Sequence, residues 1–481
     1  MVRPEGRQPR PHPALSPAGH EPNPRRLTRR AARDIYLPSP SKDVSDESVD
    51  SIVEGSTEAS PRGPEDEPVD SFLEVSLGLS ASSLPETSDR ARQAYEAIGR
   101  PLAGTTVVHV LGTNGKGSTA GFLADALAAD DVDAGIFSEP HVAGSDRLSG
   151  IRVDGDPIPA PAYRRIAREI ADAAPVEPSI REVETLVAAA YLDECNVDVA
   201  VIEAVISSGA DVTAALDTDL VAVTTVGVDH TDVLGDTRDA VAAAMADAIP
   251  SGGTVVSGGG GEPGRVIRAA AVERDASFVH PLAPVTGVTA GDGLGLRITY
   301  RDHEIASGAV GHYQVGNVRV GATAAERLGV TEGAIVEAIR AFGRPGRMET
   351  VAAAPRTVVD GAHNPHAFRA LAATVAPIDA PVTAVVGVLD KKNWAEMATI
   401  VPEFADDVIV TAPSGANPHD DAPAPPEAVA AAIPAPTAVV RDPVAATRRA
   451  RGRTPDDGLV LVVGSFYVVA PVRAAFIDGG A

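Results

Sequence analysis

The sequence TVVHVLGTNGKGST, residues 106–119, carries the strongest indication of fold and function in this chain. A strand pattern at Thr106–Leu111 runs into a glycine-rich loop, and a helix pattern begins at once. Strand, glycine-rich loop, lysine, hydroxyl and helix is the order of a nucleotide phosphate-binding loop. Glycines let backbone N–H groups converge on phosphate oxygens, and the helix N-terminus adds a favourable dipole. The sequence therefore predicts a nucleotide site here.

The residue types of this loop suit individual roles in that site. Lys116 can reach the β and γ phosphates, and Ser118 or Thr119 can reach Mg²⁺. A structural glycine-rich turn is the alternative, but the chain has only four lysines and one stands at this place. The residues expected to contact nucleotide here are Gly112, Thr113, Asn114, Gly115, Lys116, Gly117, Ser118 and Thr119.

Composition excludes several classes of function. The net charge of −25 argues against general binding to nucleic acid or an anionic membrane. The single cysteine, Cys195, permits neither an intrachain disulfide nor a multi-cysteine metal site. The longest apolar run is too short to span a bilayer, and no signal-peptide core is found at the N-terminus. We therefore expect a cytoplasmic protein. The acidic, lysine-poor composition favours adaptation to high salt, and a GC-rich genome is the alternative explanation.

The chain divides into a polar tail and an α/β part. Residues 1–72 lack a helix or strand period, so we expect a disordered tail. Short valine-rich runs then alternate with amphipathic segments, which predicts parallel sheets covered by helices. Gly343–Arg347 is interpreted as a linker, giving one domain at 73–342 and a smaller one at 343–481. A β-rich insert is expected between Val285 and Ala309.

The strands and helices expected in this α/β part follow from the same periodicity. The strands are Thr106–Leu111, Asp133–Phe137, Val197–Glu203, Leu220–Thr225, Thr254–Ser257, Thr357–Asp360, Val382–Gly387, Asp407–Thr411, Ala438–Arg441 and Leu459–Val463. The helices are Gly117–Ala129, Ala160–Ala173, Ile180–Cys195, Arg238–Ala248, Val315–Leu328 and Glu332–Phe342.

Beyond the loop, a series of motifs occurs in one order over most of the α/β part. They are His109–Thr119, Ser138–His141, Ile202-Glu203, Gly227–Thr231 with Leu234–Thr237, Gln314 with Asn317, Pro345–Arg347, Asp360–Pro365, Asp390-Lys391 and Gly464-Ser465. Together they resemble the folylpolyglutamate synthase and dihydrofolate synthase family of the Mur ligases. That resemblance implies a two-domain architecture, with a P-loop ATPase-like domain followed by a Rossmann-like domain.

The resemblance also implies an activity. In the family, ATP phosphorylates a carboxylate of the acceptor, and the amino group of glutamate attacks the acyl phosphate to form an amide. The expected cofactors are ATP and Mg²⁺, and the expected substrates are a folate- or pteroate-like acid and L-glutamate. A monomer is expected, with no nucleic-acid or membrane partner.

Site residues carry over by motif. Lys116, His230 and Lys391 would be catalytic, and Ser118, Glu139, Glu203 and His230 would hold metal. Gln314, Asn317, Arg347, Asp360 and His363 would contact nucleotide: the first two the adenine, Arg347 the phosphates and Asp360 the ribose. Structural alternatives stay open: a solvated strand-end carboxylate for Glu203, a structural histidine for His230, helix capping for Gln314 and Asn317, and a surface turn for Lys391.

The sequence departs from the family at several positions. Glu139 replaces a serine that serves the second metal, and Ser207–Ala214 lacks the arginine and asparagine of the corresponding family motif. Met245 stands where the family has a carbamylated lysine, and a thioether is a poor ligand for a hard cation. Three interpretations remain: a folate-type ligase with a rearranged metal site, a Mur-type ligase for another acid and amino acid, or a non-catalytic nucleotide-binding paralogue.

Overall fold

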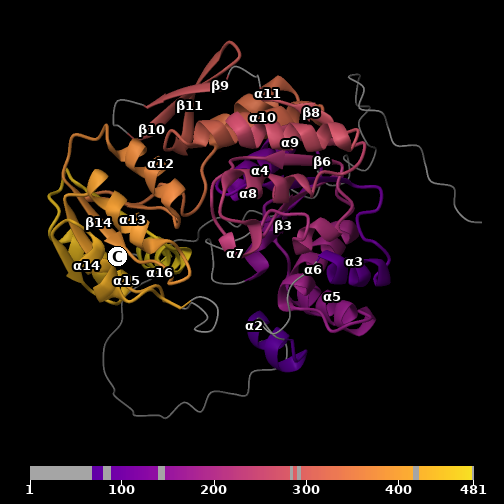
Figure 1. Ribbon diagram of the computed structural model, residues 1–481, viewed down its shortest axis with the longest axis horizontal. Coiled ribbons are helices and arrows are strands. Elements are labelled where there is room, and N and C mark those ends of the chain that lie inside the picture. The colour runs from indigo at the N-terminus through magenta and orange to yellow at the C-terminus, as the bar shows by residue number, and fades with distance from the viewer. Residues whose placement is uncertain are drawn as a thin grey trace, which may run out of the picture. The chain divides into compact units, whose positions relative to one another are not determined.

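The computed structural model describes residues 68–79, 88–138, 147–281, 285–289, 294–414 and 422–478. Three sheets, of eight, three and six strands, follow one another along the chain (Figure 1). Helices separate most of the parallel strands, so the expected α/β class is confirmed. Within the described ranges, no helix combines the length and apolar character that a membrane span requires.

The eight-stranded sheet has the order β4-β3-β2-β5-β1-β6-β7-β8. Its strands are β1 (Thr106–Leu111), β2 (Ala134–Phe137), β3 (Ile151–Val153), β4 (Asp156–Pro157), β5 (Val199–Glu203), β6 (Leu220–Val223), β7 (Thr254–Ser257) and β8 (Ser277–Val279). β1 pairs in parallel with both β5 and β6, and β3 and β4 add an antiparallel edge. Because β1 is central, the loop that follows it lies at the middle of the sheet's carboxyl edge, where open α/β sheets bind ligands.

Alternate side chains of β1 enter two different cores, as a strand buried on both faces requires. Val108 and Val110 pack beneath α4 (Lys116–Ala129), α10 (Gln314–Arg327) and α11 (Glu332–Ala341). Val107 faces α5 (Ala160–Ala173) and α6 (Ile180–Glu194).

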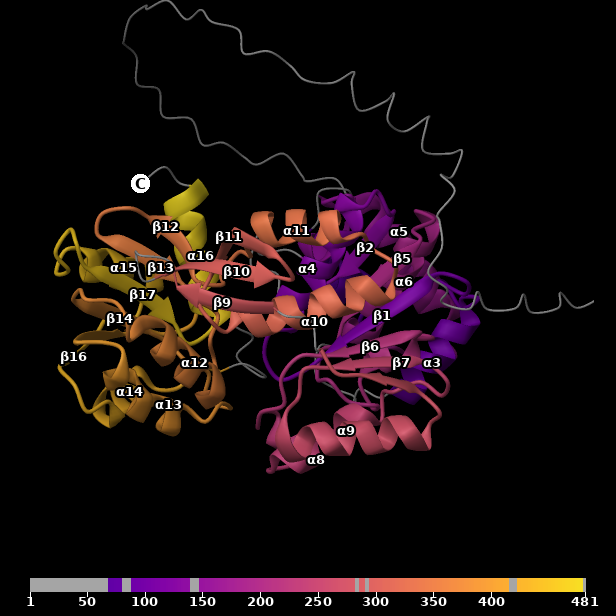
Figure 2. The same ribbon diagram turned by 90° about the horizontal axis from the view of Figure 1, so that it is seen from above.

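Leu111 joins a third cluster with α8 (Arg238–Ala246) and α9 (Gly261–Glu273), which lie side by side (Figure 2). Together these clusters bury the strand that carries the phosphate loop.

The three-stranded sheet occupies the expected insert. It contains β9 (Val285–Thr289), β10 (Gly295–Tyr300) and β11 (His303–Val310), all antiparallel, with β10 in the middle. Ile298 and Tyr300 of β10 enter the same core as α4 and α10. The insert therefore supports the helix that lies against the phosphate loop.

The six-stranded sheet has the order β12-β13-β17-β14-β15-β16. The strands are β12 (Glu349–Ala352), β13 (Arg356–Val359), β14 (Val382–Val386), β15 (Asp407–Val410), β16 (Thr437–Val439) and β17 (Leu459–Val463); β12 alone is antiparallel to its neighbour among these. The helices are α12 (Pro365–Val375), α13 (Trp394–Ile400), α14 (Pro426–Ala432), α15 (Pro443–Arg451) and α16 (Phe466–Arg473). Polar loops at the carboxyl ends of β13 and β14 carry the second set of site residues.

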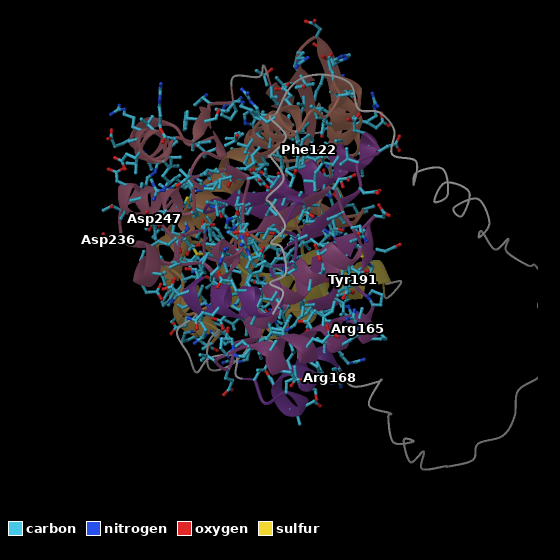
Figure 3. The ribbon with its side chains drawn as sticks, turned by 90° about the vertical axis from the view of Figure 1, so that its right-hand side faces the viewer. Phe122, Arg165, Arg168, Tyr191, Asp236 and Asp247 are labelled. Carbon is cyan, nitrogen blue, oxygen red and sulfur yellow. The ribbon has the colours of Figure 1, made fainter. Side chains whose placement is uncertain are left out.

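The folded part of the chain includes residues that we expected in the tail. Residues 1–67 lie outside the described part of the chain, but α2 (Val69–Ser71) and the π-helical turn Phe72–Ser76 are packed. Phe72 and Leu73 are fully buried, and the guanidinium of Arg168 lies 4.6 Å from the Phe72 ring centroid. Arg168 stands on α5 and is labelled in Figure 3. α3 (Ser88–Ala97) follows and packs against α5 and α6.

Candidate active site

The phosphate loop is held against β6 by hydroxyl groups. Thr224 and Thr225 each donate a side-chain hydrogen bond to the Asn114 carbonyl, at 2.7 and 3.0 Å. A Cβ on Gly112 would lie 1.9 Å from Thr224 Oγ1, and Gly112 has φ 142°, so only glycine fits. Gly115 has φ 89° and begins α4, which places Lys116 in the first turn of the helix. The loop is therefore shaped before any ligand arrives.

The Glu203 carboxylate approaches this loop at Gly117, the residue before a buried serine. Glu203, at the end of β5, has Oε2 2.9 Å from the position of a Cβ on Gly117 and accepts a hydrogen bond from Ser138 Oγ at 2.8 Å. The neighbouring Ser118 is buried, and its hydroxyl has no hydrogen-bond partner among the described residues. Buried hydroxyls are normally paired, and oxygen ligands are those that Mg²⁺ prefers. Ser118 and Glu203 therefore fit a magnesium ion.

An amide pair on α10 packs against the other side of the loop. Asn317 Nδ2 donates to Gln314 Oε1 at 2.7 Å, and both side chains are buried. A Cβ on Gly115 would lie 2.1 Å from Asn317 Oδ1. Gln314 and Asn317 thus adjoin the phosphate loop, and their contact with adenine stays a prediction.

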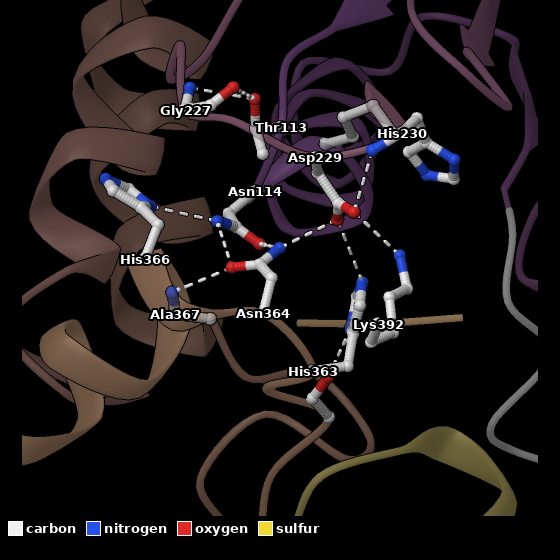
Figure 4. A network of polar contacts seen from close by, with 12 residues as sticks. Thr113, Asn114, Gly227, Asp229, His230, His363, Asn364, His366, Ala367 and Lys392 are labelled. Atoms are coloured by element: carbon white, nitrogen blue, oxygen red, sulfur yellow. Dashed lines mark hydrogen bonds and ion pairs between the residues drawn. The ribbon is translucent and has the colours of Figure 1, made fainter. Parts of the chain in front are cut away.

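The loop after β13 reaches the phosphate loop through Asn364 (Figure 4). Asn364 and Asn114 exchange two side-chain hydrogen bonds, at 3.1 and 3.2 Å. Asn364 Oδ1 also caps α12 by accepting from Ala367 N at 2.9 Å, while Asn114 Nδ2 lies 2.9 Å from His366 Nδ1. This amide pair joins residues that are 250 positions apart in the sequence.

Asp229 is the acidic centre of the same network. Its carboxylate accepts from Lys392 Nζ at 2.8 Å, from Asn364 Nδ2 at 2.9 Å and from the His230 backbone N–H at 2.9 Å, and His363 Nε2 lies 3.8 Å away (Figure 4). Burial acts to raise the pKa of Asp229, but Lys392, His230 and His363 hold it well below its usual value. Asp229 is therefore ionised at neutral pH.

Both histidines around this carboxylate are neutral. Burial, followed by the Lys392 charge, lowers the pKa of His230 and of His363 to about 4 each. His363 Nδ1 lies 2.8 Å from the Gly361 carbonyl, a bond that requires a proton on Nδ1 and leaves Nε2 facing Asp229. Neutral imidazole is the form that can accept a proton or bind a metal.

The carboxylate of Asp360, the residue after β13, already accepts several hydrogen bonds. Its carboxylate accepts from Tyr313 Oη at 2.8 Å, Met348 N at 2.9 Å and Ala362 N at 2.8 Å, and burial raises its pKa. Arg347 lies nearby, with its guanidinium 4.3 Å from the Phe466 ring centroid. Asp360 thus anchors the loop that carries His363, and its bond to a ribose stays a prediction.

Comparisons with known proteins bear on the family and on the fold. Residues 346–466 match the family model "Mur ligase, glutamate ligase domain". A probable bifunctional folylpolyglutamate synthase/dihydropteroate synthase of Haloferax volcanii is 32% identical over 420 residues, covering 81% of this chain and 48% of that protein. Folylpolyglutamate synthase of Lacticaseibacillus casei is 28% identical and covers 82% of this chain and 96% of its own. The chain belongs to the folylpolyglutamate synthase and dihydrofolate synthase family.

Solved structures share the fold of this family member. E. coli FolC in complex with DHPP and ADP has a TM-score of 0.77 at 24% identity, over 87% of this chain and 100% of that chain. The Yersinia pestis folylpolyglutamate synthase/dihydrofolate synthase complexed with AMPPNP and Mn has a TM-score of 0.74 at 25% identity, over 86% and 99%. The two-domain Mur ligase architecture is thereby confirmed. The chain spans about half the length of the bifunctional relatives from Haloferax volcanii and Halobacterium salinarum.

The predicted metal centre of this family member stays a prediction. Glu139 lies outside the described residues. Among the side chains that are described, no three of His, Cys, Asp and Glu form a metal-binding group. Lys391 is exposed, whereas the neighbouring Lys392, which the sequence analysis did not select, binds Asp229.

The two altered segments of this family member have structural roles. Met245 is fully buried in the apolar cluster that contains Leu111 and Val223, so its thioether belongs to the core. Asp211 caps the turn Val212–Ala215 by accepting from Thr213 N at 2.9 Å. Ser207 touches the phosphate loop, a contact that no spacing in the sequence indicated.

Proposed function

We propose that this chain is an ATP-dependent ligase that adds glutamate to a folate- or pteroate-type carboxylate. One observation carries the proposal: Glu203, at the end of β5, brings Oε2 within 2.9 Å of a Cβ position on Gly117, which stands between Lys116 and Ser118. The buried Ser118 hydroxyl has no hydrogen-bond partner among the described residues. Names of the relatives support the substrate class, since they are folylpolyglutamate and dihydrofolate synthases. In this proposal residues 73–342 bind ATP and residues 343–481 bind the amino acid.

The reaction consists of two displacements. A carboxylate oxygen of the acceptor attacks the γ-phosphorus of ATP, and ADP leaves with the electrons of the broken P–O bond. The glutamate nitrogen then attacks the acyl carbon, a proton leaves the nitrogen and phosphate departs, forming the amide. Negative charge develops on transferring oxygens in both steps, so cationic groups supply most of the stabilisation.

The residues of the phosphate loop would bind the triphosphate. Lys116 Nζ would contact the β and γ phosphates together with the backbone N–H groups of residues 112–119. Ser118 and Glu203 would hold Mg²⁺, with Glu139 and His230 as further ligands. The ion would neutralise charge on the phosphates. Gln314 and Asn317 would contact the adenine, Arg347 the phosphates and Asp360 the ribose.

Residues after β13 and β14 would act at the acyl phosphate. His363 and Lys391 would lie beside the nucleotide and the incoming glutamate. A neutral His363, whose pKa burial lowers to about 4, can accept a hydrogen bond from the attacking amine and orient it. The contact between Asn364 and Asn114 would keep water from the acyl phosphate, because it joins the loops on either side of the reacting groups. A monomeric, cytoplasmic enzyme remains part of this proposal.

Turnover with defined substrates tests the proposal. The purified chain in molar KCl would receive ATP, Mg²⁺, glutamate and either dihydropteroate or a reduced folate, with amide product measured by mass spectrometry. The proposal predicts product that requires all components and is lost in Lys116→Ala. ADP release with another acid would indicate a different Mur-type ligase, and nucleotide binding without turnover would indicate a non-catalytic paralogue; either result overturns the folate assignment.

A further inference from the structure

Ser207 has an unusual backbone for its residue type. It has φ 70°, in the left-handed region that favours glycine, and its side chain is fully buried. A serine in this region is strained relative to glycine. The segment is nevertheless held there, because Asp211 Oδ2 accepts from Ser207 N at 2.8 Å and also from Ile206 N.

The hydroxyl of Ser207 binds both polar groups of one peptide residue. Gly112 N donates to Ser207 Oγ at 3.1 Å, and Ser207 Oγ donates to the Gly112 carbonyl at 3.1 Å. A hydroxyl has one donor and two acceptor positions, so both bonds form at once. Gly112 is the first residue of the phosphate loop and is buried. A glycine at position 207 would relieve the backbone and lose both bonds.

The Gly112 carbonyl has a second donor, Lys116 Nζ, at 3.1 Å. The ammonium has three donor positions, so Lys116 can keep this bond while it contacts a phosphate oxygen. The Gly112 carbonyl therefore helps to fix where the Lys116 ammonium lies, and Ser207 in turn holds the Gly112 peptide.

We propose that Ser207 is a positioning residue for nucleotide binding: its hydroxyl holds the Gly112 peptide, whose carbonyl positions the Lys116 ammonium for phosphate. This inference rests on the proposed function, since it requires Lys116 to bind ATP. The turn that follows Ser207 in the chain is held in place by side-chain hydrogen bonds. Asp211 Oδ1 accepts from the Thr213 N–H and hydroxyl at 2.9 and 2.7 Å, and Thr213 Oγ1 lies 2.7 Å from the buried His109 Nε2 on β1.

Three variants separate the hydroxyl from the backbone strain. Ser207→Ala keeps the strain and removes the hydroxyl, whereas Ser207→Gly removes both. Ser208→Ala is the control, because Ser208 is a buried neighbour for which no side-chain bond to the phosphate loop is found in the described part of the chain. Dissociation constants for ATP and for AMP would be measured in molar KCl, with thermal unfolding recorded for each variant.

We expect a loss of affinity only for nucleotides whose phosphates contact Lys116. Ser207→Ala and Ser207→Gly should both weaken ATP binding about tenfold, with AMP binding and Ser208→Ala within about twofold of wild type. Ser207→Gly should melt at a higher temperature than Ser207→Ala and still bind ATP poorly.

An equal loss of affinity for ATP and for AMP would show that Ser207 has a structural role only, which would overturn the inference. Unchanged ATP affinity in both variants would also overturn it. Absence of ATP binding in the wild type would instead overturn the proposed function, and this inference with it.

Discussion

The buried ion pair between Lys392 and Asp229 predicts a large loss of stability when one of its two charges is removed. The side chains are 10% exposed each, and Nζ lies 2.8 Å from Oδ1. Lys392→Met removes the charge with little change in length. Among the described residues, Asp229 would keep the Asn364 amide, the His230 N–H and the more distant His363. Removing one partner of a buried pair costs about 3–5 kcal/mol. Because two hydrogen bonds to Asp229 remain, we expect the free energy of unfolding to fall by about 3 kcal/mol, the lower end of this range.

Urea unfolding at constant molar KCl measures this loss. The double variant Lys392→Met/Asp229→Asn removes both charges and should recover to within about 1–2 kcal/mol of wild type. Lys391→Met is the matched control, because that lysine is exposed, and should change the free energy of unfolding by less than about 0.5 kcal/mol. A loss below about 1 kcal/mol for Lys392→Met, or a double variant no more stable than the single one, would refute the reasoning.

Three further predictions concern pH, the core and the metal. His230 and His363 have pKa values of about 4 when folded and near 6.5 when unfolded, so the unfolded chain takes up protons first as the pH falls. The free energy of unfolding should hold above pH 6.5 and fall by about 3 kcal/mol per histidine by pH 4, and a flat urea midpoint over this range would contradict it. Met245→Lys should lower the free energy of unfolding by about 3 kcal/mol or more, whereas Met245→Leu should lower it by less than about 1.5 kcal/mol. A lysine variant that is stable and more active would contradict this, because it would show that the core around position 245 opens to a cation. Glu203→Gln should raise the Mg²⁺ concentration needed for half-maximal activity by at least about tenfold, measured by ADP release, while an unchanged requirement would remove Glu203 from the metal site.

The elements that sequence analysis located best are those with strong local patterns. β1, β7, β17 and α5 have the expected bounds. The three strands are valine-rich runs that stop at glycine, and α5 is one continuous amphipathic period between Pro159 and Pro175. The α9 helix was missed, because it follows the glycine run 258–261 and is stabilised by Ile267 and Ala271 in the core. Tertiary packing there outweighs a weak local propensity.

The phosphate loop could be predicted because its residues are consecutive, whereas the network around Asp229 could not. Lys392 is 163 positions from Asp229, and Asn364 is 135. Both Asp229 and Asn364 stand in motifs that the sequence analysis had singled out, but one-dimensional spacing does not show which motifs meet. Lys391 was preferred to Lys392 from the motif alone, and its role stays a prediction.

The proposed function requires that a carboxylate of the acceptor is activated by phosphoryl transfer from ATP. An acceptor carrying ¹⁸O in the reacting carboxylate would be turned over with ATP, Mg²⁺ and glutamate, and the inorganic phosphate examined by mass spectrometry. The account predicts one ¹⁸O atom in each phosphate released, because the oxygen that attacks the γ-phosphorus leaves with it when the amide forms. Phosphate that contains only ¹⁶O, formed together with ADP, would contradict the account.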